Sequence, residues 1–328
     1  PIADNMTTAL VMASVAMAVG QGHPKFVLVA CINIVVAANS GGAWSPFGDI
    51  TTLMVWQKGV FPAHEFLALF LPSLVSWLIP AALMSLSVPR ATPQPLAVRP
   101  EIRPGGLVLL GMFIGTIALT VTLHSVLHLP PVLGMMGGLG ALMLVSYVLN
   151  RTGTVRRYSL QDSGGVSDVG SSDPHRQQGG RLNTFRQVAR SEWDTLLFFY
   201  GIIMSVGGLG TLGYLALGSQ ALYGDLGPTV ANVLVGIVSA VIDNIPVMFA
   251  VLTMFPEMND GQWLLVTLTA GIGGSLLAIG SAAGVAVMGI ASGVYTFFGH
   301  LRWSWAIALG YVAGIAVHFW LNAAYFAA

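Results

Sequence analysis

Long runs of apolar residues, separated by short polar segments, dominate the pattern of this chain. A helix that crosses the hydrocarbon core of a bilayer needs about 20 predominantly apolar residues. Uninterrupted runs of this kind predict transmembrane helices at Glu65–Leu86, Gly105–Leu123, Pro131–Leu149, Leu196–Leu217 and Trp303–Ala324. The pattern therefore predicts an all-α polytopic membrane protein.

A second group of apolar runs is too short to cross a bilayer or is broken by Gly, Pro and polar residues. The group consists of Ile2–Val19, Phe26–Trp56, Thr229–Met254 and Trp263–Phe298. Irregular backbone at membrane depth is tolerated only where it is buried in protein or lines a cavity. We therefore expect these segments, and not the regular spans, to contain the functional site.

The composition agrees with a membrane protein and excludes several functions. Of 328 residues, 55% are hydrophobic and 8% are charged, whereas soluble domains carry roughly 25% charged residues. The formal net charge of zero leaves no basic surface for nucleic acid. Cys31 is the only cysteine, which excludes an intramolecular disulfide and a cysteine-rich metal site. The sequence has no Walker-type phosphate loop, and we expect no soluble cofactor.

Arginine residues gather in two polar segments and predict the orientation of the chain. They lie in the Pro-rich connector Ser87–Pro104 and in the Gly-, Ser- and Asp-rich stretch Asn150–Ser191, which is typical of a flexible loop. The two segments flank two predicted spans, so they lie on the same side, and the positive-inside rule makes that side cytoplasmic. Continuing the count of spans places the turn with His300 and Arg302 in the cytoplasm as well.

The broken segments contain a repeated motif. Ala38–Asp49 aligns with Ala270–Ser281 through an Ala, a Gly-Gly pair and a later Gly, and an Asp-Asn pair precedes each of them: Asp4-Asn5 and Asp243-Asn244. Because the first pair enters from the cytoplasm and the second from outside, the sequence predicts an inverted repeat. In secondary transporters such corresponding broken helices mark the substrate and ion site near the membrane midplane. A full helix precedes the second Asp-Asn pair but not the first, so we expect the natural polypeptide to be longer at its N-terminus.

Three carboxylates, Asp4, Asp49 and Asp243, stand within apolar segments. A charge at the bilayer centre costs at least ~2.5 kcal/mol, so each is a candidate functional group. The alternative is that one of them caps a helix or pairs with a buried amide. Sodium prefers oxygen ligands, as other hard cations do. The motifs supply such oxygens, and the candidate ion-binding and proton-coupling residues are Asp4, Asn5, Thr7, Thr8, Asn39, Ser40, Ser45, Asp49, Asp243, Asn244, Ser275 and Ser281.

The first half of the repeat is the more acidic one, because Ser281 stands in the second half where Asp49 stands in the first. Backbone carbonyls freed by an unwound helix add ligands for a cation. Burial favours the protonated form of a carboxyl group, and a bound cation favours the ionised form. A carboxyl group that alternates between the protonated and the cation-bound form would exchange a cation for a proton by competition. We expect sodium to be held by Asp4, Asn5, Thr8, Asn39 and Asp49.

His124, His128 and His318 fall in or near apolar helices. Because histidine is the side chain that ordinarily titrates near neutrality, His124 and His318 are candidates for proton relay or pH sensing. The alternative is that each is hydrogen-bonded within helix packing. Their spacing does not resemble a zinc site.

At these motifs the chain resembles the NhaD-type sodium/proton antiporters of the ion transporter superfamily. The resemblance runs from Pro1 to Ala328 and lacks the N-terminal part of the family. It rests on Asp4-Asn5-Met6-Thr7-Thr8, on the long string from Asn39-Ser40-Gly41-Gly42 through Asp49-Ile50-Thr51-Thr52, and on Asp243-Asn244-Ile245-Pro246.

The resemblance implies a fold with two re-entrant hairpins from opposite faces, two discontinuous helices between them and a separate scaffold. It implies a homodimer in the bacterial inner membrane that moves by an elevator mechanism. Export of sodium or lithium against proton entry would serve pH homeostasis and salt tolerance. The expected segments are transport-domain parts at 1–60 and 227–300, scaffold helices at 61–150 and 193–226, a flexible basic cytoplasmic loop at 151–192 and a C-terminal transmembrane helix at 301–328.

Two other functions use buried polar groups of this kind. A dicarboxylate or oxyanion (arsenite-like) carrier of the same superfamily needs an anion pocket, yet Asp4 and Asp243 stand where such relatives have Ser. An intramembrane aspartyl protease also needs two buried carboxylates, but its second motif is Gly-x-Gly-Asp, and Pro46 stands at the first Gly position before Asp49. We therefore expect a transporter and not an enzyme.

Overall fold

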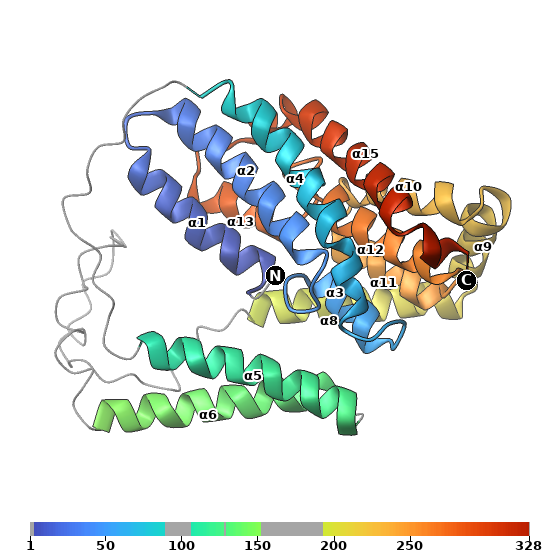
Figure 1. Ribbon diagram of the computed structural model, residues 1–328, viewed down its shortest axis with the longest axis horizontal. Coiled ribbons are helices and arrows are strands. Elements are labelled where there is room, and N and C mark those ends of the chain that lie inside the picture. The colour runs from blue at the N-terminus through green and yellow to red at the C-terminus, as the bar shows by residue number, and fades with distance from the viewer. Residues whose placement is uncertain (1–2, 89–105, 128, 152–192, 328) are drawn as a thin grey trace. The chain divides into compact units, whose positions relative to one another are not determined.

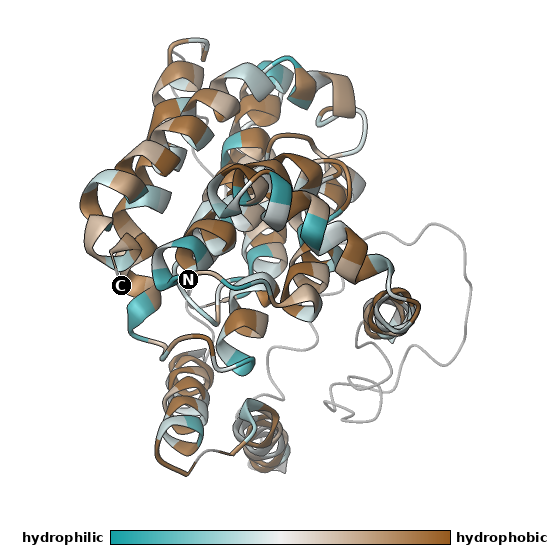
Figure 2. Cartoon of the chain, turned by 90° about the vertical axis from the view of Figure 1, so that its right-hand side faces the viewer, coloured by the Kyte–Doolittle hydropathy of each residue, from teal (hydrophilic) through white to brown (hydrophobic). Residues whose placement is uncertain are grey.

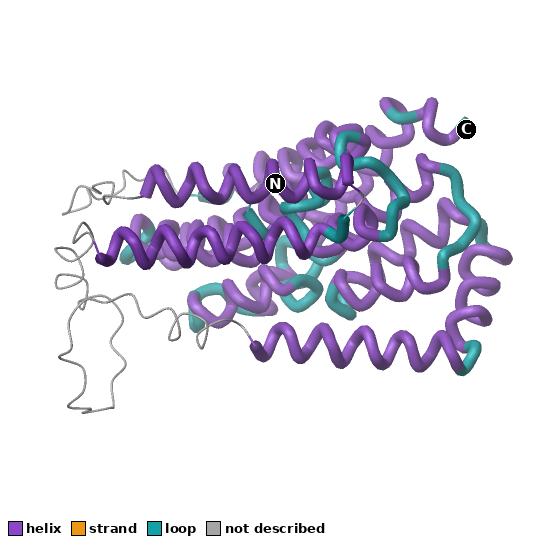
Figure 3. Tube along the Cα trace, turned by 90° about the horizontal axis from the view of Figure 1, so that it is seen from below, coloured by secondary structure: helices purple, strands orange, loops and turns teal. Residues whose placement is uncertain are grey.

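The computed structural model describes residues 3–88, 106–127, 129–151 and 193–327, and every regular element among them is a helix (Figure 3). Most of these helices are rich in hydrophobic residues, which are brown in Figure 2. The all-α prediction is confirmed for this part of the chain. The predicted loop at 151–192 lies outside the described residues apart from Arg151, the last residue of a helix.

Four helices of the described chain are long and apolar enough to cross a membrane. They are α2 (Pro24–Gly42), the continuous segment of η1 (Glu65–Leu69) and α4 (Phe70–Ser85), α5 (Gly106–Leu127) and α15 (Ser304–Leu321). The last three lie where the sequence predicts regular spans. The predicted helix from Pro131 also forms, as α6 (Pro131–Arg151).

One span that was predicted as a continuous helix is broken in the structure. The run Leu196–Leu217 forms α8 (Trp193–Thr211) and α9 (Tyr214–Ser219), which continues into the π-helical turn η3 (Gln220–Asp225). The two parts meet at an angle of 83°. Gly213 lies at the bend with φ +85°, a left-handed conformation that glycine adopts without the steric cost of a side chain. The apolar pattern did not show the bend, because it continues through the turn.

The broken segments are discontinuous, as predicted. Helix α2 ends at Gly42 and α3 (Ile50–Gln57) begins after Asp49, while α12 (Asp260–Gly273) and α13 (Ala282–Ile290) are separated in the same way by 274–281. A further break lies between α10 (Pro228–Ser239) and α11 (Asn244–Met254). The first of the predicted short segments, Ile2–Val19, forms one helix, α1 (Asn5–Val19).

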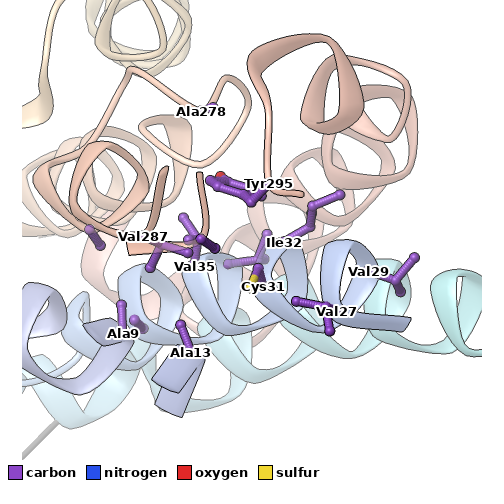
Figure 4. Close-up of a cluster of buried hydrophobic side chains, with 14 of the residues drawn as sticks. Ala9, Ala13, Val27, Val29, Cys31, Ile32, Val35, Ala278, Val287 and Tyr295 are labelled. Atoms are coloured by element: carbon purple, nitrogen blue, oxygen red, sulfur yellow. The ribbon is translucent and has the colours of Figure 1, made fainter. Parts of the chain in front are cut away.

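A buried apolar cluster fixes the first pair of helices against the second half of the chain. Helix α1 lies beside α2 (Figure 1) and contributes the small side chains of Ala9 and Ala13. Ile32 and Val35 of α2 face Val287 of α13 (Figure 4). Because small residues on α1 let the backbones approach closely, the broken ends of both halves are held near one another.

Helices α4 and α15 pack at close distance. A Cβ on Gly310 or Gly314 of α15 would overlap Ser76 of α4, so only glycine allows this approach. Ser76 Oγ donates to the carbonyl of Pro72 at 2.9 Å and is satisfied within its own helix. The pair also contacts α2 and α12, and so it supports the broken helices from one side.

The chain divides into two compact units, one of Pro1–Leu96 with Phe199–Ala328 and the other of Ala97–Phe198. In the second unit α5 packs on α6, where Gly134 and Gly138 leave room for Thr120 and Thr116. The remaining surfaces of this helix pair expose many large apolar side chains, including Leu107 and Leu144. Exposed apolar helix faces of this kind suit contact with lipid.

Candidate ion-binding site

Asp49 is a buried carboxylate at the first residue before α3. It is 3% exposed, and its Oδ1 accepts a hydrogen bond from the backbone N–H of Thr51 at 3.0 Å. Its Oδ2 accepts from the side-chain amide of Asn5 at 2.9 Å and from that of Asn244 at 3.2 Å. The asparagines of both Asp-Asn pairs therefore donate to the same carboxylate oxygen.

Asn39, in the last turn of α2, joins this carboxylate to the second broken helix. Its Oδ1 accepts from the amide of Asn5 at 3.1 Å. Its Nδ2 donates to Ser275 Oγ and to Ser281 Oγ, each at 2.9 Å. The hydroxyl of Ser281 also accepts from the backbone N–H of Gly284, which caps α13. The donors and acceptors of both halves thus form one buried network.

This buried network consists of six residues that the sequence singles out: Asn5, Asn39, Asp49, Asn244, Ser275 and Ser281. All six are buried. Helix ends position them: Asn5 and Asn244 are the first residues of α1 and α11, and Asp49 and Ser281 directly precede α3 and α13. The network brings one carboxylate together with amide and hydroxyl groups, and the oxygens of such groups are the kind of ligand that suits a hard cation.

The other two membrane carboxylates lie at corresponding helix starts but differ in their partners. Asp4 Oδ2 accepts from the backbone N–H of Met6 at 3.1 Å and of Thr7 at 3.3 Å, so Asp4 caps α1. Asp243 precedes α11 without capping it, and its Oδ1 is buried with no hydrogen-bond partner among the described residues. A buried carboxylate oxygen without a partner is costly, and a bound cation or water would satisfy it.

The hydrogen bonds described for the remaining candidate residues involve partners outside the network. Thr8 Oγ1 reaches the carbonyl of Ala3 at 3.5 Å, and Thr7 is exposed. Ser45 Oγ accepts from the backbone N–H of Phe47 at 3.3 Å. Ser40 is buried, but no described residue bonds to its hydroxyl. The prediction that these side chains bind an ion stays a prediction.

The structure adds residues to the site that the sequence analysis did not propose as ion ligands. Thr52 Oγ1 donates to the carbonyls of Gly42 and Ala43, at 3.3 and 3.4 Å, where the first helix breaks. In the second half, Ser304 Oγ donates to the carbonyl of Leu276 at 2.6 Å. Carbonyls released by the breaks are thus partly taken by side chains. A hydroxyl residue after a Gly-Gly break was the available signal for Thr52; Ser304 had none.

His300 is the third such residue and is fully buried. Its Nε2 lies 2.8 Å from the carbonyl oxygen of Ser275, and its Nδ1 lies 2.8 Å from Tyr295 Oη. A carbonyl oxygen only accepts, so Nε2 carries the proton and Nδ1 accepts from the tyrosine hydroxyl. The ring therefore holds the backbone at Ser275, whose hydroxyl belongs to the network. From sequence, His300 was only a cytoplasmic turn residue, because its contacts come from a distant segment.

The two histidine candidates are hydrogen-bonded to backbone carbonyls. His318 Nε2 lies 3.0 Å from the carbonyl of Gly261, and its Nδ1 accepts from Asn322 Nδ2 at 2.9 Å. His124 Nδ1 lies 3.1 Å from the carbonyl of Leu129. These bonds are those of the helix-packing alternative, and a role in pH sensing stays a prediction. Within the part of the chain that the structure describes, no three His, Cys, Asp or Glu residues group as metal ligands.

Known proteins resemble this chain over nearly its whole length. Residues 1–161 and 178–271 match the family described as Citrate transporter (CitMHS). A "Na(+)/H(+) antiporter NhaD" of Alkalimonas amylolytica is 57% identical over 327 residues, which are 98% of this chain and 67% of that protein. The protein of the same name from Vibrio parahaemolyticus is 54% identical over 95% of this chain and 75% of its own length. "Sodium/proton antiporter 1" of Arabidopsis thaliana is 34% identical over 97% of this chain and 52% of its own length.

Proposed function

Because the chain belongs to the family of NhaD-type sodium/proton antiporters, we propose that it exchanges sodium or lithium for protons across a membrane. It is a multi-pass membrane protein and a secondary active transporter, not an enzyme. The matching family model is described as Citrate transporter, whereas relatives above 50% identity are antiporters by name. The bacterial inner membrane is the location we propose.

The observation that carries this proposal is the convergence of Asn5 and Asn244 on Asp49 Oδ2. Amide N–H donors stabilise an ionised carboxylate, and burial away from water favours the protonated one. Burial and hydrogen bonding therefore act in opposite directions on one carboxyl group, which suits a group that changes its protonation state when a cation arrives. A sodium ion beside Asp49 would displace its proton, and a proton would displace the ion.

Competition at one carboxyl group produces exchange without further machinery. Sodium and a proton cannot occupy Asp49 at the same time. Each time the site moves across the membrane, it therefore carries either sodium or a proton. Asn39 extends the site to Ser275 and Ser281, which offer hydroxyl oxygens from the second half. The unpartnered oxygen of Asp243 supports a contribution of that half to cation binding.

An anion carrier is less well supported by the same residues. The hydrogen-bonding partners of the network within the described chain are carboxylate, amide, hydroxyl and backbone groups, and none is Lys or Arg. A dicarboxylate or oxyanion placed against Asp49 would meet a like charge with no cation to offset it.

The finer architecture is part of the proposal. We infer two inverted repeats whose Asp-Asn pairs enter from opposite faces, with two re-entrant hairpins and a homodimer that moves by an elevator mechanism. The matching helix starts support the repeat: α1 begins directly after Asp4 and α11 directly after Asp243, and each broken helix resumes after Asp49 or Ser281. Family resemblance supports the dimer and the mode of movement.

The proposal is tested in everted membrane vesicles from cells that lack their own antiporters, with the complete gene expressed. A fluorescent dye follows a preformed proton gradient while sodium, lithium, potassium or citrate is added. We expect sodium and lithium alone to restore fluorescence, and Asp49→Asn to abolish the response. Asp225→Asn is the matched control, because Asp225 is exposed and outside the network. A response to citrate without one to sodium would replace cation exchange by anion transport.

A further inference from the structure

Two buried hydroxyl groups lack a hydrogen-bond partner where α2 faces α4. Ser40 is 3% exposed and Ser73 is 1% exposed, and neither hydroxyl oxygen bonds to any described residue. A buried hydroxyl without a hydrogen-bond partner destabilises the fold. Groups of this kind in native proteins are normally satisfied by ordered water or by a ligand.

Both serines line the same partly open pocket of about 180 Å³. Its walls include Gly41, Trp44, Phe70 and Trp77. A molecule of liquid water takes about 30 Å³, so the cavity has room for several. Two hydroxyls that each donate and accept are the polar partners that such water needs, and we call this space the Ser40–Ser73 chamber.

The aromatic walls of the chamber are fixed in place. Trp77 Nε1 donates to Asn33 Oδ1 at 2.7 Å, so its only polar atom is already used. Trp44 meets Phe70 edge to face, with ring centroids 5.1 Å apart. Indole rings also attract cations through the negative charge of their faces. The chamber therefore combines two oxygen ligands with walls that tolerate a positive charge.

The chamber is connected to the network through neighbouring residues of α2. Ser40 directly follows Asn39, whose side chain bonds to both halves of the network. A larger cavity of about 380 Å³ shares Ala37 and Trp77 with the chamber and is lined by Thr8, one turn after Asn5 in α1. Two cavities on one helix thus reach the residues beside the network, where an ion must enter and leave.

We propose that the Ser40–Ser73 chamber is a water-filled binding site for the transported monovalent cation on its way to Asn39 and Asp49. The two hydroxyls replace part of the hydration shell while water keeps the rest. In this role Ser40 binds the cation in the chamber and not in the network. Ser73, on a helix that carries no motif, becomes the second ligand. The identity of the cation rests on the proposed function; the hydration of the chamber does not.

Thiol labelling tests the proposal on the full chain in membranes. Cys31 is the only cysteine, so a Cys31→Ala background carries no thiol, and Ser73→Cys places one in the chamber. A membrane-impermeant, positively charged methanethiosulfonate should modify Ser73→Cys, and sodium should slow the reaction at least about fivefold relative to choline at equal ionic strength. Ser76→Cys is the matched control: it lies one turn further on α4, packs on Gly314 and already bonds to Pro72. It should stay unmodified.

Each outcome decides the matter. No modification of Ser73→Cys, the same rate as Ser76→Cys, or a rate that sodium leaves unchanged would overturn the chamber as a cation site. Sodium protection in a protein that shows no sodium/proton exchange would leave the chamber standing and remove the proposed function. Sodium/proton exchange without sodium protection of Ser73→Cys would remove the chamber as a cation site and leave the proposed function standing.

Kinetics give a second readout that does not depend on the added thiol. Ser73→Ala and Ser40→Ala should each raise the apparent KM for sodium about three- to tenfold, the effect of one lost oxygen ligand. Ser76→Ala should leave the KM unchanged. Equal values for Ser73→Ala and Ser76→Ala, with equal amounts of folded protein, would contradict the proposal.

Discussion

The side-chain amide of Asn244 donates to Asp49 Oδ2 at 3.2 Å, although 195 residues separate the two in the chain. The bond places the start of α11 against the start of α3. Asn5 reaches the same oxygen at 2.9 Å from the start of α1. Two asparagines of one repeated motif therefore act on a single carboxylate, and the candidate ion site draws on both halves of the chain.

Removing either asparagine should disturb the balance at Asp49. Asn5→Ala or Asn244→Ala removes one donor that stabilises the ionised carboxylate, so protonation is favoured and less sodium binds at a given pH. We expect about a tenfold rise in the apparent KM for sodium and a shift of the activity curve to higher pH. Dye-based exchange assays across a pH series measure both. An unchanged or acid-shifted curve would contradict the role of the donors.

The two asparagines share one acceptor, so their effects should not add. The double variant Asn5→Ala, Asn244→Ala should differ from the sum of the single variants by at least about 0.5 kcal/mol, as expected for residues in one network. The same assay gives the four KM values of the cycle. Strict additivity would indicate that the two amides act at separate sites.

His300 should matter through its donor to Ser275 and not through its charge. Glutamine carries an N–H at a similar reach, so His300→Gln should retain the KM for sodium within about threefold. His300→Leu leaves the Ser275 carbonyl without a partner and should raise the KM about tenfold. The matched pair is compared in exchange assays at equal amounts of folded protein. Equal losses in both variants would exclude the donor as the cause.

The pH dependence of exchange should be insensitive to His300. Burial lowers the pKa of His300 to about 4, and its bond to the Ser275 carbonyl opposes this effect only in part. The imidazole gains a proton only as the pH falls through about 4, so it stays neutral at every pH above about 5. His300→Gln should therefore leave the shape of the activity curve between pH 6 and 9 unchanged. A displaced curve would show that His300 titrates in that range.

Capping and ion binding by Asp4 are separable. Asparagine caps a helix about as well as aspartate, whereas alanine does not. Asp4→Asn should therefore keep the thermal stability and lower sodium affinity through the lost charge, while Asp4→Ala should also lower the free energy of unfolding by about 1 kcal/mol. Thermal unfolding in detergent and exchange assays measure the two effects. Full exchange by Asp4→Asn would limit Asp4 to the role of a cap.

The close contact of α4 and α15 gives a prediction about stability. A Cβ on Gly314 would overlap Ser76 and lie 2.9 Å from the carbonyl oxygen of Pro72. Gly314→Ala should therefore destabilise the protein by about 1–3 kcal/mol through overpacking. Gly115→Ala is the control, because nothing lies within 4 Å of its Cβ position in α5. The melting temperature in detergent should fall for the first variant alone.

The pattern of the chain was enough to predict the class of protein, most of its helices and most residues of the buried network. Length and continuity of an apolar run decide whether a segment can cross a membrane, so η1 with α4, α5 and α15 lie where the pattern predicts spans. The repeated motif also singled out Asn5, Asn39 and Asp49, because polar groups within apolar segments need a reason to be there.

Only the tertiary structure decided how these groups are connected. Hydrogen bonds across the chain, such as Asn39 to Ser281 and His300 to Ser275, depend on where distant backbones meet, and no local pattern encodes that. The bend at Gly213 escaped the apolar pattern because hydropathy does not register a backbone angle. The fold likewise made Asp4 a cap and left an oxygen of Asp243 without a partner, although the two carboxylates begin the same motif.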